Sequence, residues 1–226
     1  MDFREIANKT ADILQGYMKD DSGWEVAKKT KDILIEFKHS KEFGGNLYRG
    51  TSEFSAPPET VFQYVDPLPG DAPRLKWDKG LKKIEILKEI ADDIRINRTC
   101  TDSACMGMIS PRDFVDVVLT KKTENGISTN EVSIVAQAVL IILACVSVDY
   151  AECPADKKFV RGWNHHCGLI CLSMPDKPGH TKLVSLIQPD IRGMLPRALV
   201  DSAIPGSMTE FFTNLRQCLK DDGKLQ

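Results

Sequence analysis

Two histidines and two cysteines lie close together in the second half of the chain, and these side chains are common zinc ligands. His165, His166 and Cys167 are consecutive, and Cys171 follows four residues later. This spacing fits no common zinc motif, and no second ligand pair of suitable spacing accompanies it. On a strand, Cys167 and Cys171 would share a face but lie too far apart to chelate one ion. We therefore predict packed cysteines beside a histidine pair in a turn, and no metal site.

Short motifs that mark nucleophilic, metal-dependent or nucleotide-dependent enzymes are absent from the sequence. The chain has no G-x-S-x-G, no H-E-x-x-H, no Walker P-loop and no Rossmann glycine pattern. Acidic and basic residues are plentiful, but none has a partner at a diagnostic spacing. A triad can be assembled from distant residues, so an enzyme stays an alternative without positive support. We predict no catalytic residues and no cofactor.

A small basic cluster near the N-terminus, Lys28, Lys29 and Lys31, follows Trp24. Charge runs of this kind are usually solvated surface. The alternative is docking to an anionic membrane, where each basic residue contributes on the order of 1 kcal/mol. The net charge of −2 gives the chain no global basic field, so nucleic acid is not an expected partner. We predict the three lysines as the membrane-docking residues.

The composition is that of one folded domain. The chain has 226 residues, of which 42% are hydrophobic and 27% charged, so residues 1–226 can bury a substantial core. Its seven cysteines show no framework of spacings, and no signal peptide is recognisable. These features predict free thiols and a cytoplasmic location.

The pattern along the chain predicts an α+β fold, in which two amphipathic helices enclose a run of strands. Asp2 can cap the first helix, which ends near residues 20–23. The last helix places Met208, Phe211, Phe212 and Leu215 on one face, and Pro205 predicts a kink or break before it. A short helix is expected at 59–65, and strands at 32–37, 46–54, 81–90, 94–100, 114–122, 159–163, 168–174 and 182–189.

An apolar run at 132–148 requires a choice between a membrane span and a core element. A spanning helix needs about 20 apolar residues. Here Ser133, Gln137 and Ser147 interrupt the run, and no strongly basic segment flanks it. A buried strand or a core helix is the better interpretation.

Six segments in order along the chain resemble the START (StAR-related lipid transfer) domain family. They are GNLYRG at 45–50, KWD at 76–78, ISPRDFVD at 109–116, FVRGWNHHCG at 159–168, DIRGMLP at 190–196 and SMTEFFTNL at 207–215. The matches extend over nearly the whole chain, and WEVAKKTKD near the start resembles the small START-only sterol-carrier branch. The resemblance implies a helix-grip fold, in which a curved antiparallel sheet of about nine strands wraps around the long C-terminal helix. The space between them is a lipid cavity.

The implied function is transfer of one sterol-like lipid between membranes by a monomer, with transient contact to membrane surfaces, including anionic ones. A lipid-sensing or scaffold module without shuttling activity is the alternative. The implied lid is the loop around 122–127 together with one face of the last helix. The implied lipid-binding residues are Trp77, Thr99, Met108, Val118, Ser147, Asn164, Met208, Phe211, Phe212 and Leu215. Arg112 and Asp113 are expected to be structural, because a buried arginine needs acceptors.

The chain departs from the family pattern in two places. Thr99 and Val118 stand where some relatives have an acidic and a basic residue, so no buried ion pair is predicted in the cavity. A hydroxyl contact to the lipid would then come from Thr99, Ser147 or water, which leaves cholesterol, other sterols, steroids and bile acids open. An extra stretch near 131–145 could extend two strands, add a helix over the lid or damage the sheet.

Overall fold

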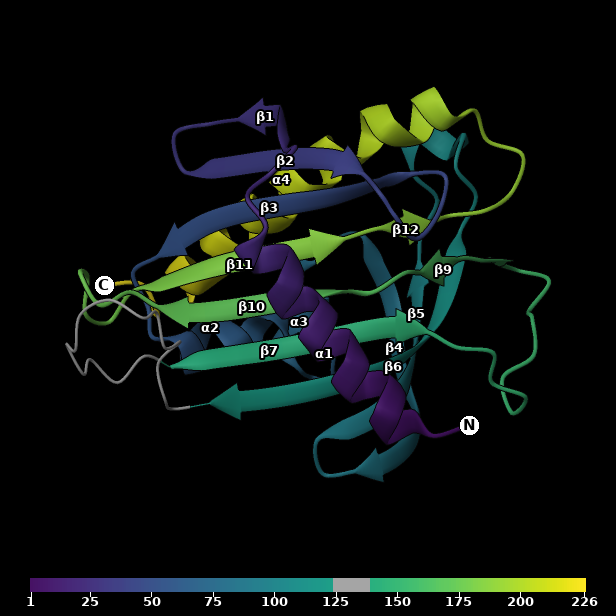
Figure 1. Ribbon diagram of the computed structural model, residues 1–226, viewed down its shortest axis with the longest axis horizontal. Coiled ribbons are helices and arrows are strands. Elements are labelled where there is room, and N and C mark those ends of the chain that lie inside the picture. The colour runs from purple at the N-terminus through teal and green to yellow at the C-terminus, as the bar shows by residue number, and fades with distance from the viewer. Residues whose placement is uncertain (124–138) are drawn as a thin grey trace.

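A long antiparallel sheet forms the centre of the computed structural model, which describes residues 1–123 and 139–226 (Figure 1). Within these residues its main path has nine strands, in the order β1-β2-β3-β11-β10-β7-β6-β5-β4. They are β1 (Glu25–Lys29), β2 (Ile33–His39), β3 (Asn46–Phe54), β4 (Leu81–Ala91), β5 (Ile94–Thr101), β6 (Arg112–Thr123), β7 (Leu140–Ser147), β10 (Cys167–Ser173) and β11 (Thr181–Ile187). Three two-residue strands complete the set: β8 (Val160–Arg161), which pairs with β6, and β9 (Trp163–Asn164), which pairs with β12 (Pro189–Asp190).

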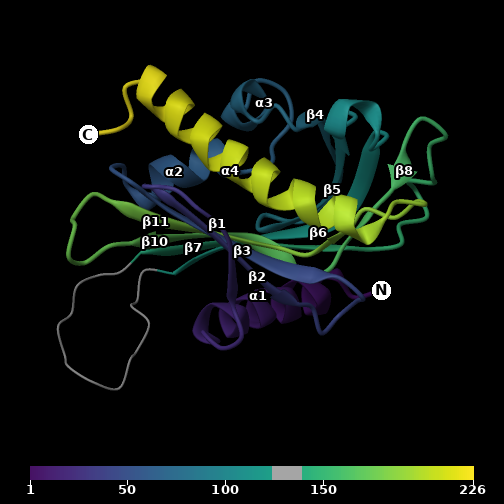
Figure 2. The same cartoon turned by 90° about the horizontal axis from the view of Figure 1, so that it is seen from above.

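The helices cover opposite faces of this sheet. Figure 2 shows α1 (Phe3–Lys19) on one face, and α2 (Pro58–Val65), α3 (Pro73–Trp77) and α4 (Arg197–Asp221) on the other. Asp2 caps α1 by accepting hydrogen bonds from the backbone of Arg4 and Glu5. The strands β4 and β5 curl toward α4 at one end of the sheet (Figure 2). We call the α4 side the inner face and the α1 side the outer face.

Because successive side chains of a strand point to opposite faces, the sheet has a separate hydrophobic core on each face. In β7, Ile142 and Ala144 join the outer core with Leu14 of α1, whereas Ile141 and Leu143 join the inner core. The inner core also contains the buried residues of α4: Val200, Ile204, Met208, Phe212, Leu215 and Leu219. A strand that is buried on both faces has apolar residues at consecutive positions, which explains the nearly continuous apolar sequence of β7.

The apolar run at 132–148 is therefore a central strand where the structure describes it. Leu140–Ser147 pairs with β6 on one side and, over most of its length, with β10 on the other. Of the extra stretch predicted near 131–145, residues 140–145 belong to this strand, and 131–138 lie outside the described residues. Among the helices of the described chain, none is long and apolar enough to cross a membrane.

The predicted α+β architecture is confirmed, with corrections at individual elements. The predicted strand 159–163 is instead the two short strands β8 and β9. The edge strand β1 was not predicted. Of the kink or break expected at Pro205, the break does not occur, because α4 is continuous from Arg197 to Asp221. Buried residues on both sides of the proline, Ile204 and Met208, hold the two halves of α4 against the same core and outweigh the one lost backbone hydrogen bond.

Candidate functional site

A cavity of about 480 Å³ lies between the inner face of the sheet and α4. Its volume is within the range of roughly 300–1,000 Å³ that is typical of pockets for small ligands. The sheet contributes Phe114, Leu143, Leu169 and Ile187, and α4 contributes side chains from Val200 to Phe211. Exposed residues at 79–80 and 102–103 form part of its rim. The lining is mostly apolar, which suits an apolar ligand.

The polar part of this lining centres on Asp116 of β6. Its Oδ1 accepts a hydrogen bond from the Ser147 hydroxyl at 2.6 Å, and its Oδ2 accepts one from the Asn164 amide at 2.9 Å. The Ser147 oxygen in turn accepts from the Asn164 backbone N–H at 2.7 Å. Burial raises the pKa of Asp116 to about 6, against the lowering effect of the two hydrogen bonds. The cavity therefore contains a carboxylate that is mostly ionised at neutral pH.

Asp113 lies one strand position away from the cavity wall and holds three strands together. Its fully buried carboxylate accepts hydrogen bonds from Arg98 of β5 and Arg161 of β8, with closest contacts of 2.9 Å to each. Burial favours the neutral acid, but these two arginines outweigh it and lower the pKa of Asp113. The structural role predicted for Asp113 thus has a clear geometric basis.

Arg112 anchors a different part of the chain and does not pair with Asp113. It is 4% exposed and lines the cavity. Its guanidinium donates to the backbone oxygens of Ile191, at 3.0 Å, and Arg192, at 3.2 Å, and also to that of Ser110. It therefore ties the start of β6 to the loop that leads into α4.

The predicted lipid-binding residues divide into three groups. Four of them line the cavity: Thr99, Asn164, Met208 and Phe211. Four are buried in the surrounding core without lining it: Trp77, Val118, Phe212 and Leu215. Ser147 is buried and reaches the cavity through its hydrogen bond to Asp116, whereas Met108 is 56% exposed and is not part of the lining.

Trp77 and Met108 show why residues near the rim are hard to place from sequence. The Trp77 ring packs edge-on against Phe211, with centroids 5.1 Å apart. Its indole N–H donates to the backbone carbonyl oxygen of Tyr64 at 2.9 Å. Trp77 therefore contacts a residue of the cavity lining, Phe211, without lining the cavity itself. Met108 was expected at the cavity or its rim, but the neighbouring Ile109 occupies the lining position.

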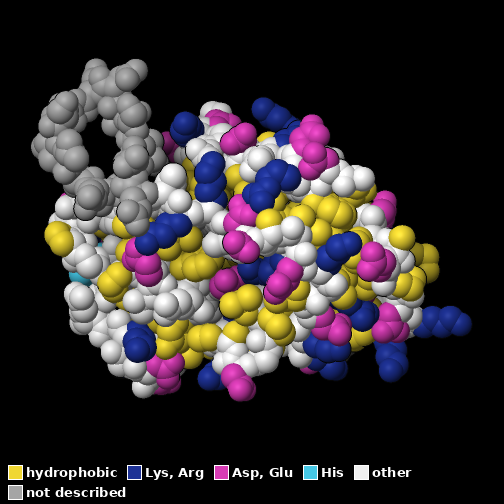
Figure 3. Space-filling model, turned by 90° about the horizontal axis from the view of Figure 1, so that it is seen from below, with side chains coloured by type: hydrophobic (Ala, Val, Ile, Leu, Met, Phe, Trp, Pro, Cys, Tyr) yellow, Lys and Arg dark blue, Asp and Glu magenta, His cyan; other side chains and the backbone are white. Residues whose placement is uncertain are grey.

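The residues predicted to dock to membranes lie away from the cavity lining. Lys28 and Lys29 are on β1, whose five residues are all exposed, and Lys31 is exposed in the turn before β2. Of the predicted lid loop, Lys122 and Thr123 end β6, and residues 124–127 lie outside the described part. On the face seen in Figure 3, basic and acidic side chains are interspersed rather than gathered into a patch of one sign.

Asp116 is the functional candidate that the sequence reasoning missed. The signal was available, because Phe114, Asp116 and Val118 alternate on one face of β6 and an acidic residue interrupts two apolar ones. A carboxylate within an apolar strand face is costly to bury unless hydrogen-bond donors surround it. Such a residue therefore marks a candidate site.

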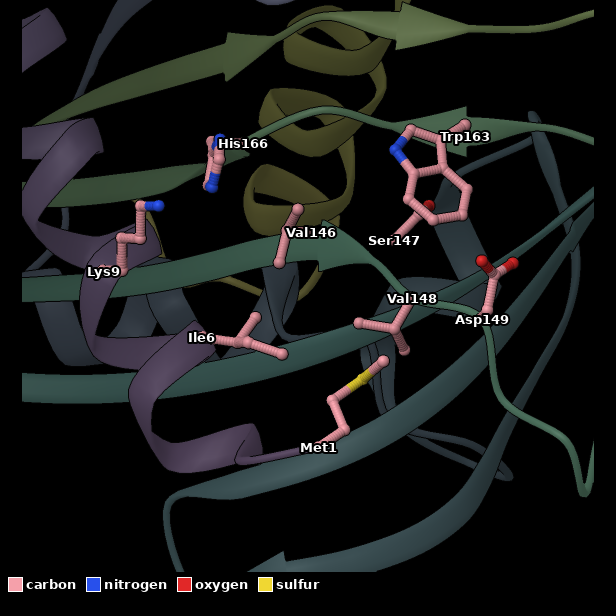
Figure 4. Close-up of a pocket in the computed structure, with 9 residues that line it drawn as sticks. All are labelled: Met1, Ile6, Lys9, Val146, Ser147, Val148, Asp149, Trp163 and His166. Carbon is pink, nitrogen blue, oxygen red and sulfur yellow. The ribbon is translucent and has the colours of Figure 1, made fainter.

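A second, smaller pocket of about 270 Å³ lies on the outer face beside α1 (Figure 4). Ile6 and Lys9 of α1 border it, together with Val146, Trp163 and His166. Ser147 borders this pocket and also donates a hydrogen bond to Asp116 of the cavity lining. The smaller volume and the charged Lys9 make it less suited to an apolar ligand than the cavity.

Comparisons with known proteins found a family model, relatives and a solved structure that match nearly the whole chain. The family model of the START domain matches residues 9–224. StAR-related lipid transfer protein 5 of Mus musculus is 40% identical over 205 residues, which cover 90% of this chain and 89% of the relative. StAR-related lipid transfer protein 4 of Homo sapiens is 32% identical over 208 residues, 92% of each chain. The structure of human StAR-related lipid transfer protein 5 superimposes with a TM-score of 0.87 at 35% identity, covering 98% of both chains.

Proposed function

Because the chain belongs to the START domain family, we propose that it binds one sterol-like lipid in its internal cavity and carries it between membranes. The observation that supports this most directly is the cavity of about 480 Å³, whose largely apolar lining contains the buried carboxylate of Asp116. The relatives named as lipid transfer proteins are similar over nearly the whole chain. No bond is made or broken in this function.

The apolar lining explains how such a carrier could accelerate transfer. A lipid that moves from water into an apolar site gains roughly 25 cal/mol for each Å² of apolar surface removed from water. For several hundred Å² the gross gain is on the order of 10 kcal/mol, and the same term makes spontaneous exit from a bilayer slow. A protein cavity replaces water as the intermediate environment.

Asp116 favours a ligand with a hydroxyl group at the polar part of the cavity. Each oxygen of its carboxylate accepts one hydrogen bond from the protein and keeps the capacity to accept another. A ligand O–H would fill that capacity, whereas a ligand carboxylate at the same place would be repelled by the like charge. We therefore favour a neutral hydroxylated sterol, oriented with its hydroxyl toward Asp116.

The proposal also includes where and how the carrier works. We propose a cytoplasmic monomer that contacts membranes transiently, with Lys28, Lys29 and Lys31 on the docking surface. Their exposure on and beside β1 allows such contact without rearrangement of the sheet. Each could contribute on the order of 1 kcal/mol at an anionic surface.

Transfer of a fluorescent sterol from donor to acceptor liposomes, with and without anionic lipid, tests this function. We expect rapid protein-dependent transfer, and a roughly tenfold loss toward anionic acceptors for Lys28→Ala with Lys29→Ala. The matched control is Lys157→Ala with Lys158→Ala, an exposed consecutive pair on another loop, which should transfer normally. Well-folded protein that neither binds nor transfers the sterol would contradict the proposal. Binding without transfer would instead favour the lipid-sensing module.

A further inference from the structure

Two cysteine side chains face each other across adjacent strands inside the cavity. The register of β7 and β10 places Cys145 directly opposite Cys167, and both side chains line the cavity. The Cys145 thiol is the main cause of an upward shift in the pKa of Cys167. Both cysteines are free in this structure.

The backbone geometry of this pair is compatible with a disulfide. Directly opposed residues of antiparallel strands have Cα atoms about 4.5–5.5 Å apart. A disulfide accepts Cα separations of roughly 4.4–6.8 Å. Cys171, on the same strand and the same face, lies opposite Ile141 and lacks such a partner. The strand register therefore distinguishes the Cys145–Cys167 pair from its neighbour.

The surroundings of the pair determine which oxidants can reach it. Cys167 is 7% exposed, and the neighbouring Cys145 thiol together with burial raises its pKa well above the ordinary value. A thiol that ionises so weakly reacts slowly with any oxidant that is not held beside it. The route to both sulfurs is the apolar cavity, which favours an apolar oxidant.

We propose that Cys145 and Cys167 form an oxidisable dithiol, which closes to a disulfide when an organic hydroperoxide enters the cavity. The proposal rests on the cavity as an apolar binding site and is independent of which sterol the protein carries. An oxidised lipid is the natural source of such a hydroperoxide for a lipid carrier.

The reaction proceeds in two balanced steps. The sulfur of Cys145, the less buried of the two, attacks the terminal oxygen of the hydroperoxide. An S–O bond forms as the O–O bond breaks, and the thiol proton of Cys145 passes to the departing oxygen. The hydroperoxide thus leaves as an alcohol, and Cys145 becomes a sulfenic acid. The sulfur of Cys167 then attacks the Cys145 sulfur, the S–S bond forms, and the sulfenic oxygen leaves as water with the proton of Cys167. Two thiols are oxidised and one hydroperoxide is reduced.

Oxidation of the reduced, ligand-free full chain with cumene hydroperoxide tests the proposal. Intact-mass measurement should show the loss of two hydrogen atoms, and peptide mapping should identify a Cys145–Cys167 disulfide with one cumyl alcohol formed per protein. Hydrogen peroxide at the same concentration should react severalfold more slowly, because it gains nothing from the apolar lining. Cys145→Ser and Cys167→Ser should each abolish the disulfide.

Cys171→Ser is the matched control, since it changes a buried thiol on the inner face of the same strand without removing either partner. It should form the Cys145–Cys167 disulfide at the normal rate. Circular dichroism and thermal melting establish that each variant is folded before oxidation. A disulfide between other cysteines, or oxidation to sulfinic acid without a disulfide, would overturn the proposal. Sterol binding measured on the same samples separates this outcome from failure of the proposed carrier function.

Discussion

Asp116 shows how a single residue can oppose folding while serving a site. Its ordinary pKa of 3.8 rises to about 6 because the carboxylate is buried, so the folded protein binds this proton more tightly than the unfolded chain does. The stability this proton confers is complete below pH about 4 and is lost as the pH rises through about 6. A pKa difference of this size corresponds to roughly 3 kcal/mol.

Asp116→Asn should therefore stabilise the protein at neutral pH, by about 1–3 kcal/mol, and leave its stability at pH 4 nearly unchanged. In the same variant, the ratio of the affinity for a hydroxylated sterol to the affinity for the matching ketone should fall roughly fivefold. The reason is that a neutral acceptor binds a hydroxyl less strongly than a carboxylate does. Urea unfolding from pH 4 to 8, with sterol binding at pH 7.4, measures both effects. A variant that is destabilised at neutral pH would show that the carboxylate contributes more to folding than its burial costs.

Single residues also show the limit of prediction from a helical pattern. Spacing identifies Met208, Phe211, Phe212 and Leu215 as the apolar side of α4, and all four are at least partly buried. It cannot separate Met208 and Phe211, which line the cavity, from Phe212 and Leu215, which fill the core. That distinction depends on how far the sheet curves away from the helix, and the curvature is a property of the assembled strands.

Between elements, a half-buried polar network around Glu42 joins α1 to the sheet. One carboxylate oxygen accepts hydrogen bonds from Tyr17 of α1 and, at 2.6 Å, from Gln188. The other contacts the ring nitrogen of His166 at 2.7 Å. Burial opposes ionisation of Glu42, but these hydrogen bonds outweigh it and lower its pKa to about 2. The network connects the end of α1, the loop after β2 and the turn before β10.

Glu42→Gln should destabilise the protein by about 1–3 kcal/mol at neutral pH, because it removes a charged acceptor from three donors. The stability conferred by Glu42 is present above its ordinary pKa of 4.5 and is lost as the pH falls toward 2. The variant should therefore differ from the original chain less at pH 3 than at pH 7 in thermal melting. Glu89→Gln, an exposed glutamate on β4, is the control and should change little.

The elements that the sequence predicts well are those with one buried and one exposed face. The bounds of β3 match the prediction, and α1 begins at its cap and ends within a residue of the expected turn. The strand β1 has five exposed residues, so it carries no alternation to detect. The short strands β8 and β9 are defined by their pairing with β6 and β12, which are distant in sequence.

At the scale of the whole molecule, the cavity lies on one side of the sheet, between its inner face and α4, beside the core that these elements share. Composition and periodicity predict the layers of an α+β fold, but the cavity was expected from the family resemblance alone. Space inside a protein depends on how side chains from several strands and α4 meet, and no local pattern encodes that fit. A large side chain placed on the cavity-lining side of α4 tests whether the ligand binds in the cavity.

Ala203→Phe should weaken lipid binding by roughly tenfold while costing little stability, since the ring enters existing space beside the lining of α4. Ala198→Phe places the same ring at an exposed position of the same helix and should leave binding unchanged. Lipid titration followed by fluorescence, with thermal melting of each variant, measures the two effects. Equal binding by both variants would show that the ligand occupies a different part of the molecule.

The exposed strand β1 has a consequence for solubility that is separate from any membrane. Within the part of the chain that the structure describes, β1 is one of the two ends of the main sheet path, so one row of its backbone donors and acceptors has no neighbouring strand there. Open edges of this kind can pair with another molecule and begin aggregation, and lysine side chains on an edge discourage such pairing. Lys28 and Lys29 occupy two of the five positions of β1, and β1 pairs irregularly with β2 between Val26 and Lys28. The positive charges of Lys28 and Lys29, which could attract a membrane, therefore also discourage the β1 edge of one copy from pairing with a strand of another copy.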